Sequence, residues 1–433
     1  MSTFIKYLRL YLHQPDGEKR AIGYLSQYGE ILRVSFDDRY VDDPDRPTLS
    51  LSYRGADDAA TRAILRATRD ARVVHTDGRW PVYFQNLLPE GHNRDRLARE
   101  RHCEPDEEFE LLAAAGHDLM GAIEVEPLAP HEGIPDVVRH WHTAMGLDVL
   151  EPGFVEYPVE DAAAIPGVVD KFSAILDGRR YAVRKKGEAG AFILKLPSTR
   201  HPDLVANEFA GYRLCRALQL DCAQAEVISR ADADLPEAVP FDEILAVRRF
   251  DRTANGRRVH MEEFAQALGY APRHKYGKGI DADDTTMLRA LNTLSSRPVQ
   301  DVREFIGRFV AFVLMGNTDA HLKNWALVYP DGRQPQLAPL YDPVCVSALF
   351  HGVPAKDYQV NRRIDEVLRR FGWAELEALL TRAGLPRVSN HLRIARNLVR
   401  QAQADWPALL SDAPDSVRTE VTARLRGGVA FTR

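Results

Sequence analysis

Cysteine is scarce in this chain, with 4 among 433 residues and no C-x-x-C pair. Such usage is typical of free thiols in a reducing compartment, and it argues against a disulfide scaffold. No secretory signal opens the sequence, and no apolar run approaches the roughly 18–20 residues of a membrane span. We therefore expect a cytoplasmic protein with no membrane partner.

A strong excess of one charge is also absent. The formal net charge is −5, from 57 Lys and Arg against 62 Asp and Glu. This balance argues against a surface devoted to nucleic acid or to anionic membranes. The composition, 45% apolar and 27% charged, is that of a soluble folded chain. Its length predicts roughly two to three domains.

Several familiar catalytic motifs are missing from the sequence. There is no Walker A loop, no H-E-x-x-H, no G-x-S-x-G elbow and no Cys/His spacing of the zinc-binding kind. The simplest explanations of the chain's chemistry are therefore excluded.

The first hundred residues form short apolar or alternating runs that are broken by Gly, Asp and Pro. This pattern is typical of β-strands joined by turns. From about residue 86 the pattern becomes helical, and acids ahead of an apolar face predict a helix at 107–115 that ends by Gly116. We expect the proline-interrupted segment 127–158 to be an irregular bridge. The expected strands are 7–12, 21–25, 31–36 and 49–53.

A second unit begins near residue 160 with a hairpin around the turn Asp177-Gly178. From residue 260 onward the apolar spacing is mostly helical, apart from the segment 316–344. This order predicts an α+β fold with two lobes, and a ligand is expected between them. The expected elements of the second unit are strands at 171–176, 180–183, 191–196, 225–228 and 243–250, with a helix at 203–218.

The segment 316–344 sets acids and amides among apolar residues. Asp319 and Asn324 are separated from Asp342 by two strand-like runs, which could form a hairpin and bring Asp342 back beside Asn324. One carboxylate facing a hydroxyl, with amide and carboxylate oxygens on a hard cation, is the arrangement of phosphoryl transfer. The alternative is that these residues only cap turns around the hairpin.

Lys195 stands between Leu194 and Leu196 in a predicted strand. A buried lysine is costly unless its charge meets an anion, and Glu208 on the following helix is a candidate partner. The alternative is an edge strand from which Lys195 points outward. Upstream, the bend at Gly167 could cover phosphates with backbone N–H groups, although a plain turn would look the same.

Residues 316–324 (GNTDAHLKN) and 337–342 (LAPLYD) closely resemble the HipA family, the kinase toxins of bacterial HipBA toxin–antitoxin pairs. The resemblance covers nearly the whole chain. Further similar segments are 84–91, 116–123, 193–197, Asn207-Glu208 and 247–252.

The resemblance implies a protein-kinase-like fold with ATP and Mg²⁺ in the cleft between the lobes. Asp319 would be the catalytic base, and Asn324 and Asp342 the metal ligands. Lys195 would hold the nucleotide phosphates. His321 would support the loop or the phosphate, and a packing role is the alternative.

Other expected nucleotide contacts follow from the same resemblance. The segment from Val247 to Phe250, with Arg248 and Phe250 as the named contacts, would lie at the hinge, with its backbone facing the adenine. Gly167, Val168 and Val169 take the place of the family's phosphate loop. The expected regions are a β-rich and then helical N-terminal subdomain (1–155), a nucleotide-binding lobe (156–250) and a helical lobe with the catalytic loop (251–433).

The resemblance also implies function and partners. Family members phosphorylate serine or threonine on proteins, with aminoacyl-tRNA synthetases as the associated substrate class. A small helix-turn-helix antitoxin that binds operator DNA restrains them. The alternatives are a catalytically idle corepressor that acts with the antitoxin, and a lipid or small-molecule kinase.

One departure from the family pattern concerns regulation. Family members commonly carry a serine three residues before the loop glycine, and phosphorylation of that serine switches the kinase off. Here the position is Ala164, which has no hydroxyl. We therefore expect restraint to come from the antitoxin or from another site.

Overall fold

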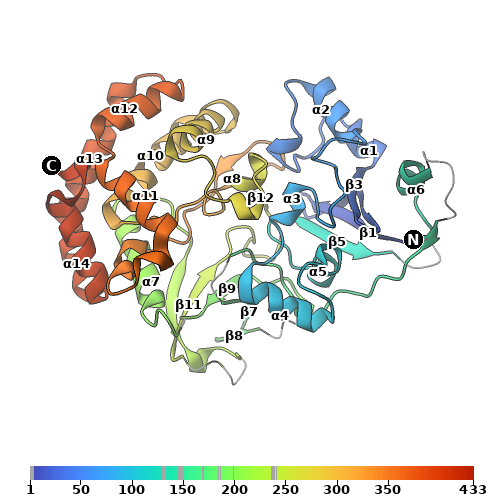
Figure 1. The fold of residues 1–433 in the computed structure, drawn as a ribbon, viewed down its shortest axis with the longest axis horizontal. Coiled ribbons are helices and arrows are strands. Elements are labelled where there is room, and N and C mark those ends of the chain that lie inside the picture. Colours follow the sequence, from blue (N-terminus) through green and yellow to red (C-terminus); the bar gives the residue numbers. More distant parts are fainter. Residues whose placement is uncertain are drawn as a thin grey trace.

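The computed structural model describes residues 4–128, 133–143, 150–167, 170–183, 185, 187–197, 199–235, 239 and 241–433. Helices α11 to α14 lie at one end of the molecule, and strands β1, β3 and β5 at the other (Figure 1). Among the described residues, no helix combines the length and the apolar character that a bilayer crossing requires.

The first sheet has the strand order β4-β3-β2-β1-β5, antiparallel throughout, and β6 pairs in parallel with β1. Alternating residues of β1, including Leu8, Leu10 and Leu12, are buried against the helices that follow. The strands are β1 (Phe4–His13), β2 (Lys19–Tyr28), β3 (Ile31–Phe36), β4 (Val74–His75), β5 (Ile123–Pro127) and β6 (Glu151–Pro152). The helices of this region are α1 (Asp38–Val41), α2 (Asp58–Leu65), α3 (Val82–Gln85), α4 (Gly91–Arg101) and α5 (Glu108–Ala114).

Two predictions for this region were wrong. The run 49–53 is no strand: Ser50 caps a 3₁₀ helix, Leu51–Tyr53, by accepting a hydrogen bond from the backbone N–H of Ser52. The expected irregular bridge 127–158 contains helix α6 (Asp136–Thr143) and strand β6. Helix α6 begins after Pro135, which suits a helix start because proline lacks the N–H that would be unpaired there.

The second sheet has the order β10-β11-β9-β7-β8. The predicted hairpin is confirmed, and Gly178 at its turn has a φ of +61°. The strands are β7 (Lys171–Asp177), β8 (Arg180–Ala182), β9 (Phe192–Lys195), β10 (Ala225–Ser229) and β11 (Glu243–Arg248). Helix α7 (Leu204–Ala217) follows β9, as predicted.

The C-terminal half is mostly helical, as predicted, but a three-stranded sheet crosses it. Strands β13 (Ala326–Tyr329) and β14 (Gln336–Leu337) form the predicted hairpin, and β12 (His260–Glu263) adds a strand that the spacing did not indicate. The helices are α8 (Phe264–Ala267), α9 (Ile280–Leu294), α10 (Pro298–Met315), α11 (Gln359–Arg370), α12 (Trp373–Arg382), α13 (Val388–Leu409) and α14 (Asp415–Ala423).

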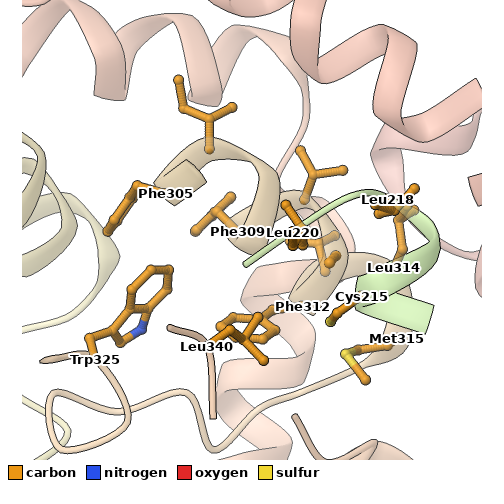
Figure 2. Packing of buried hydrophobic residues seen from close by; sticks show 14 of the residues in the cluster. Cys215, Leu218, Leu220, Phe305, Phe309, Phe312, Leu314, Met315, Trp325 and Leu340 are labelled. Carbon is orange, nitrogen blue, oxygen red and sulfur yellow. The ribbon is translucent and has the colours of Figure 1, made fainter. Parts of the chain in front are cut away.

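Helix α10 is the centre of the C-terminal core. Phe305, Phe309 and Phe312 project from it toward neighbours that include Trp325 (Figure 2). The Phe305 and Trp325 rings stack with their centroids 4.5 Å apart. Because the helix is buried over nearly its whole length, the loop that follows it starts from a fixed point.

Candidate functional site

The loop that follows α10 is tied down at its first residue. Gly316 ends the helix in the left-handed region, with a φ of +74°. A Cβ there would lie 2.7 Å from the Ser347 hydroxyl and 2.8 Å from Nε of Arg424, so a larger residue would not fit. The carbonyl of Gly316 accepts hydrogen bonds from the backbone N–H and the hydroxyl of Ser347, each 3.0 Å long.

The carboxylate of Asp319 is oriented by two side chains from outside the loop. Its Oδ1 accepts hydrogen bonds from the hydroxyl of Tyr276 and, at 3.3 Å, from the amide of Asn361. Asn317 accepts from the Asp319 backbone N–H at 3.2 Å. The second oxygen, Oδ2, lies 4.0 Å from Nε2 of His321. Asp319 is therefore held by one oxygen while the other is free of these bonds.

Asn324 and Asp342 line the same cavity of about 60 Å³, between the second sheet and the loop. The amide nitrogen of Asn324 donates to the backbone carbonyl of Asp319 at 2.8 Å, so its amide oxygen is the atom available to a cation. Asp342 adopts a left-handed backbone with a φ of +56°, and its carbonyl accepts from Asn317 at 3.4 Å. The hairpin thus returns Asp342 to the loop, as the sequence predicted.

Lys195 is buried and pairs with two carboxylates, those of Glu208 and Asp342. Burial opposes the charge, but the two carboxylates raise the pKa of Lys195 above its usual value. Burial also opposes the charge of Asp342, and the ammonium of Lys195 nevertheless lowers the pKa of that carboxyl. The predicted partner Glu208 is therefore in contact, and the edge-strand alternative for Lys195 was wrong.

The cavity is also lined by two lysines that were not predicted as site residues, Lys171 and Lys323. Lys171 is the strand partner of Lys195 across β7 and β9, and its ammonium donates to the carbonyl of Pro166 at 2.7 Å. Burial lowers the pKa of Lys171. Lys323 pairs with Glu263 at 2.9 Å. Only the strand register brings Lys171 to this place, so its own neighbours in the sequence gave no signal.

His321 also lines the cavity, and its ring packs edge-on against Tyr276 with centroids 5.4 Å apart. Burial lowers its pKa to about 4, which leaves the ring neutral at neutral pH. The ring is thus in packing contact with Tyr276, and its expected support of the loop or the phosphate stays a prediction.

The expected hinge residues Arg248 and Phe250 flank Arg249, which belongs to a buried ion network. Arg248 ends β11 opposite Phe192, and Phe250 packs on Tyr341 with ring centroids 5.6 Å apart. Neither is among the residues that line the 60 Å³ cavity. Arg249, between them, is fully buried and donates to Asp118 at 2.8 Å. The end of β11 is thereby fixed to the N-terminal region.

Asp118 is the centre of that network. It has no exposed surface, and it pairs with Lys185 at 2.5 Å and with Arg252 at 3.4 Å in addition to Arg249. Ser173 donates its hydroxyl to the same carboxylate. These buried cations lower the pKa of Asp118 far below its usual value, although burial opposes the charge.

The expected phosphate loop is described in part. Gly167 lines the cavity with a φ of +110°, and its Cα would carry a Cβ 2.6 Å from the ammonium of Lys171. Val168 and Val169 lie outside the described residues.

The donor set of the cavity fits a magnesium nucleotide. No group of three or more His, Cys, Asp or Glu that could hold a metal occurs within the described part of the chain. A site with one amide and one carboxylate suits Mg²⁺, which keeps water and phosphate oxygens as its other ligands. Three ammonium groups at the same cavity match the negative charge of a polyphosphate.

Two family models match this chain. Residues 163–406 match the HipA-like C-terminal domain, and residues 17–126 match the HipA N-terminal domain. A solved complex of HipA, HipB and operator DNA from Shewanella oneidensis contains a similar chain, with 22% identity and a TM-score of 0.65. That likeness covers 98% of this chain and 97% of the other, and it shows the fold. The predicted two-lobed, kinase-like α+β fold is confirmed.

Curated relatives extend the comparison. The Sinorhizobium fredii protein Y4dM is 33% identical over 396 residues, which is 90% of this chain and 89% of that protein. The serine/threonine-protein kinase toxin HipA of Shewanella oneidensis is 27% identical over 392 residues, 82% of this chain and 85% of that protein. With a family model that spans more than half of its length, the chain belongs to the HipA family.

Proposed function

We propose that this protein is an ATP- and Mg²⁺-dependent serine/threonine protein kinase that acts as the toxin of a type II toxin–antitoxin pair. The observation that carries the proposal is the common cavity of Lys195, Asn324 and Asp342, beside the oriented carboxylate of Asp319. A HipA-family relative named a serine/threonine-protein kinase toxin supports it.

Each residue has a role in this proposal. Asp319 accepts the proton of the substrate hydroxyl through Oδ2, because Tyr276 and Asn361 already occupy Oδ1. Lys195 and Lys171 bind phosphate oxygens. A bound Mg²⁺ would neutralise charge that develops on the transferred phosphoryl group.

The metal ligands would be the amide oxygen of Asn324 and the carboxylate of Asp342. Because Asp342 pairs with Lys195 through Oδ1 here, the ammonium would keep Glu208 as its partner while it turns from Asp342 toward the phosphates. Such an exchange of partners keeps the buried lysine paired at each stage.

The remaining nucleotide contacts are part of the same proposal. Backbone groups from Val247 to Phe250, including those of Arg248, would face the adenine. Gly167, Val168 and Val169 would cover the phosphates, and His321 would support the loop. The proposed domains are the N-terminal subdomain (1–155), the nucleotide-binding lobe (156–250) and the helical lobe with the catalytic loop (251–433).

The partners that we propose for this chain are supported by its relatives. The solved complex named above joins HipA with HipB and operator DNA. We propose that this chain likewise binds a small helix-turn-helix antitoxin, and through it operator DNA. The proposed substrate is a protein of the translation machinery, with an aminoacyl-tRNA synthetase as the class that the family resemblance suggests.

Expression in a bacterial host tests the proposal. The wild-type chain should arrest growth and transfer the γ-phosphate of labelled ATP to a protein in a cell extract. Asp319→Ala should abolish both effects while the protein still folds, as its circular dichroism would show. If the two forms are equally harmless or equally toxic, the kinase proposal fails, and two harmless forms would point to the idle-corepressor class. Labelling of lipid vesicles without protein labelling would point to a lipid kinase.

A further inference from the structure

A second cavity, of about 110 Å³, is lined in part by residues of the Asp319 loop, among them Thr318 and His321. Helices α9, α10 and α11 and the loop itself enclose it. Phe309, Phe312 and Trp325 line it as an aromatic wall. Figure 2 labels the same three side chains within the buried core. His321 lines both this cavity and the 60 Å³ cavity, so the two are neighbours at this residue.

Two buried polar atoms in the lining of this cavity have no partner. They are the hydroxyl of Thr318, a residue that is 1% exposed, and Nδ1 of His321, and neither has a hydrogen bond within the described part of the chain. An unpartnered buried polar group is costly, so such groups indicate a place where a ligand can bind. Both atoms can accept a hydrogen bond from a donor that enters the cavity.

A carboxylate completes the polar lining. Asp284 stands in the first turns of α9 beside two other acids that are already bonded. Asp281 pairs with Arg382, while Asp283 accepts from the hydroxyl of Tyr270 at 2.9 Å and from the N–H of Gly279 at 2.7 Å. Asp284 has no ion pair with any described residue.

The state of Asp284 fits a site that awaits a cation. Burial, with Asp283 next to it, raises the pKa of Asp284 to about 8. A cation that binds beside this carboxyl group would therefore stabilise its ionised form and lower its pKa. Aromatic walls attract the same kind of ligand, because the electron-rich face of a ring attracts a cation.

We infer that this cavity receives a lysine or arginine side chain of the protein substrate, near the hydroxyl that is phosphorylated. The ammonium or guanidinium group would bind Asp284 and donate to Thr318 and His321, and its aliphatic stem would pack on the aromatic wall. The inference rests on the proposed function and names a substrate preference for it.

The position of the cavity supports this role. Tyr276 lines it and donates its hydroxyl to Asp319, and His321 lies 4.0 Å from the same carboxylate. A side chain held here is one layer of residues away from the proposed base. Its backbone would consequently lie close to the acceptor residue.

A peptide library with fixed serine or threonine and one varied flanking position tests the inference with labelled ATP. At one position the wild-type chain should favour lysine or arginine over leucine by about tenfold or more. Asp284→Asn should reduce that preference to about twofold while other positions keep theirs. Asp281→Asn, an exposed acid of the same helix, is the matched control and should behave as wild type.

A binding measurement separates failure of this inference from failure of the kinase proposal. n-Butylammonium chloride, compared with sodium chloride at equal ionic strength, should raise the melting temperature of wild type but not of Asp284→Asn. If no peptide is labelled, the kinase proposal fails. The cation site is then supported by a rise in melting temperature that Asp284→Asn abolishes, and it is contradicted if wild type shows no rise. Labelling without a basic preference, a preference that survives in Asp284→Asn, or a shift that is equal in both proteins would overturn the inference.

Discussion

The ammonium of Lys195 on β9 and the carboxylate of Glu208 on α7 form a buried ion pair that joins the second sheet to its helix. The same ammonium contacts Asp342, so the pair reaches the proposed metal site. The side chain that binds phosphates in our proposal is thus positioned by a residue that touches neither metal nor substrate.

Glu208→Gln should reduce phosphoryl transfer by about tenfold or more, because truncating one partner of a buried charge pair costs several kcal/mol. It removes one of the two carboxylates that hold Lys195 and leaves the lysine to pair with Asp342 alone. The transfer rate from labelled ATP is the measurement. Glu226→Gln, an exposed change on β10, is the control, and equal rates for the two variants would contradict the proposed role.

Tyr276→Phe should lower kcat by about tenfold and leave the KM for ATP within about twofold, since the tyrosine orients the base and not the nucleotide. The lost hydroxyl is the one that donates to Oδ1 of Asp319. Steady-state kinetics with a labelled peptide or protein measures both constants. Tyr40→Phe is the control. It removes a buried hydroxyl that donates to the carbonyl of Pro47 in the N-terminal region, and it should leave kcat unchanged. A kcat near the wild-type value in Tyr276→Phe would show that Asn361 alone orients the carboxylate.

The contribution of Glu262 to the stability of the protein should fall as the pH rises from about 4.5 to 7. Burial raises the pKa of this carboxyl from 4.5 to about 7, so the folded state binds its proton more tightly than the unfolded state. The stabilising effect of that proton is complete below about pH 4.5 and is lost as the pH passes 7, a change on the order of 3 kcal/mol.

Glu262→Gln should flatten this dependence. Oε1 of a glutamine can accept from the N–H of Leu51 and the hydroxyl of Tyr329, and its amide nitrogen can donate to Ser50, so all present contacts have a replacement. Denaturant unfolding at several pH values measures the free energy. A variant whose slope with pH equals that of wild type would assign the dependence to other groups.

Self-phosphorylation in the segment 160–175 should be absent in this protein. Ala164 has no hydroxyl, and the nearby Ser173 is buried with its hydroxyl donated to Asp118. Mass spectrometry after incubation with ATP and Mg²⁺ tests this, and Ala164→Ser, which restores the family's serine, serves as the positive comparison. Heavy phosphorylation of the wild-type segment would contradict the expectation.

Local patterns in the sequence predicted much of the fold. The strand Ile31–Phe36, the hairpin at Gly178 and the helix α7 all follow from periodicity and turn residues. The contact of Lys195 with Glu208 could also be predicted, because a lysine between leucines in a buried strand requires an anion nearby.

Other features depend on contacts between distant parts of the chain. Strand β12 carries the adjacent acids Glu262 and Glu263, which are poor strand formers, and its place depends on pairing with β13 and on donors from Ser50 and Tyr329. Lys171 enters the site only through its register with Lys195. Such contacts override local propensity, and one sequence does not show them.

A crystal of the protein soaked with Mg²⁺ and a non-hydrolysable ATP analogue tests the central claim most directly. The account predicts a metal ion with side-chain oxygens of Asn324 and Asp342 in its coordination sphere at about 2.0–2.1 Å, and the Lys195 ammonium on a phosphate. Asp319 should remain off the metal with Oδ2 open to an acceptor hydroxyl. A triphosphate bound elsewhere, or Asn324 and Asp342 turned away from the metal, would contradict it.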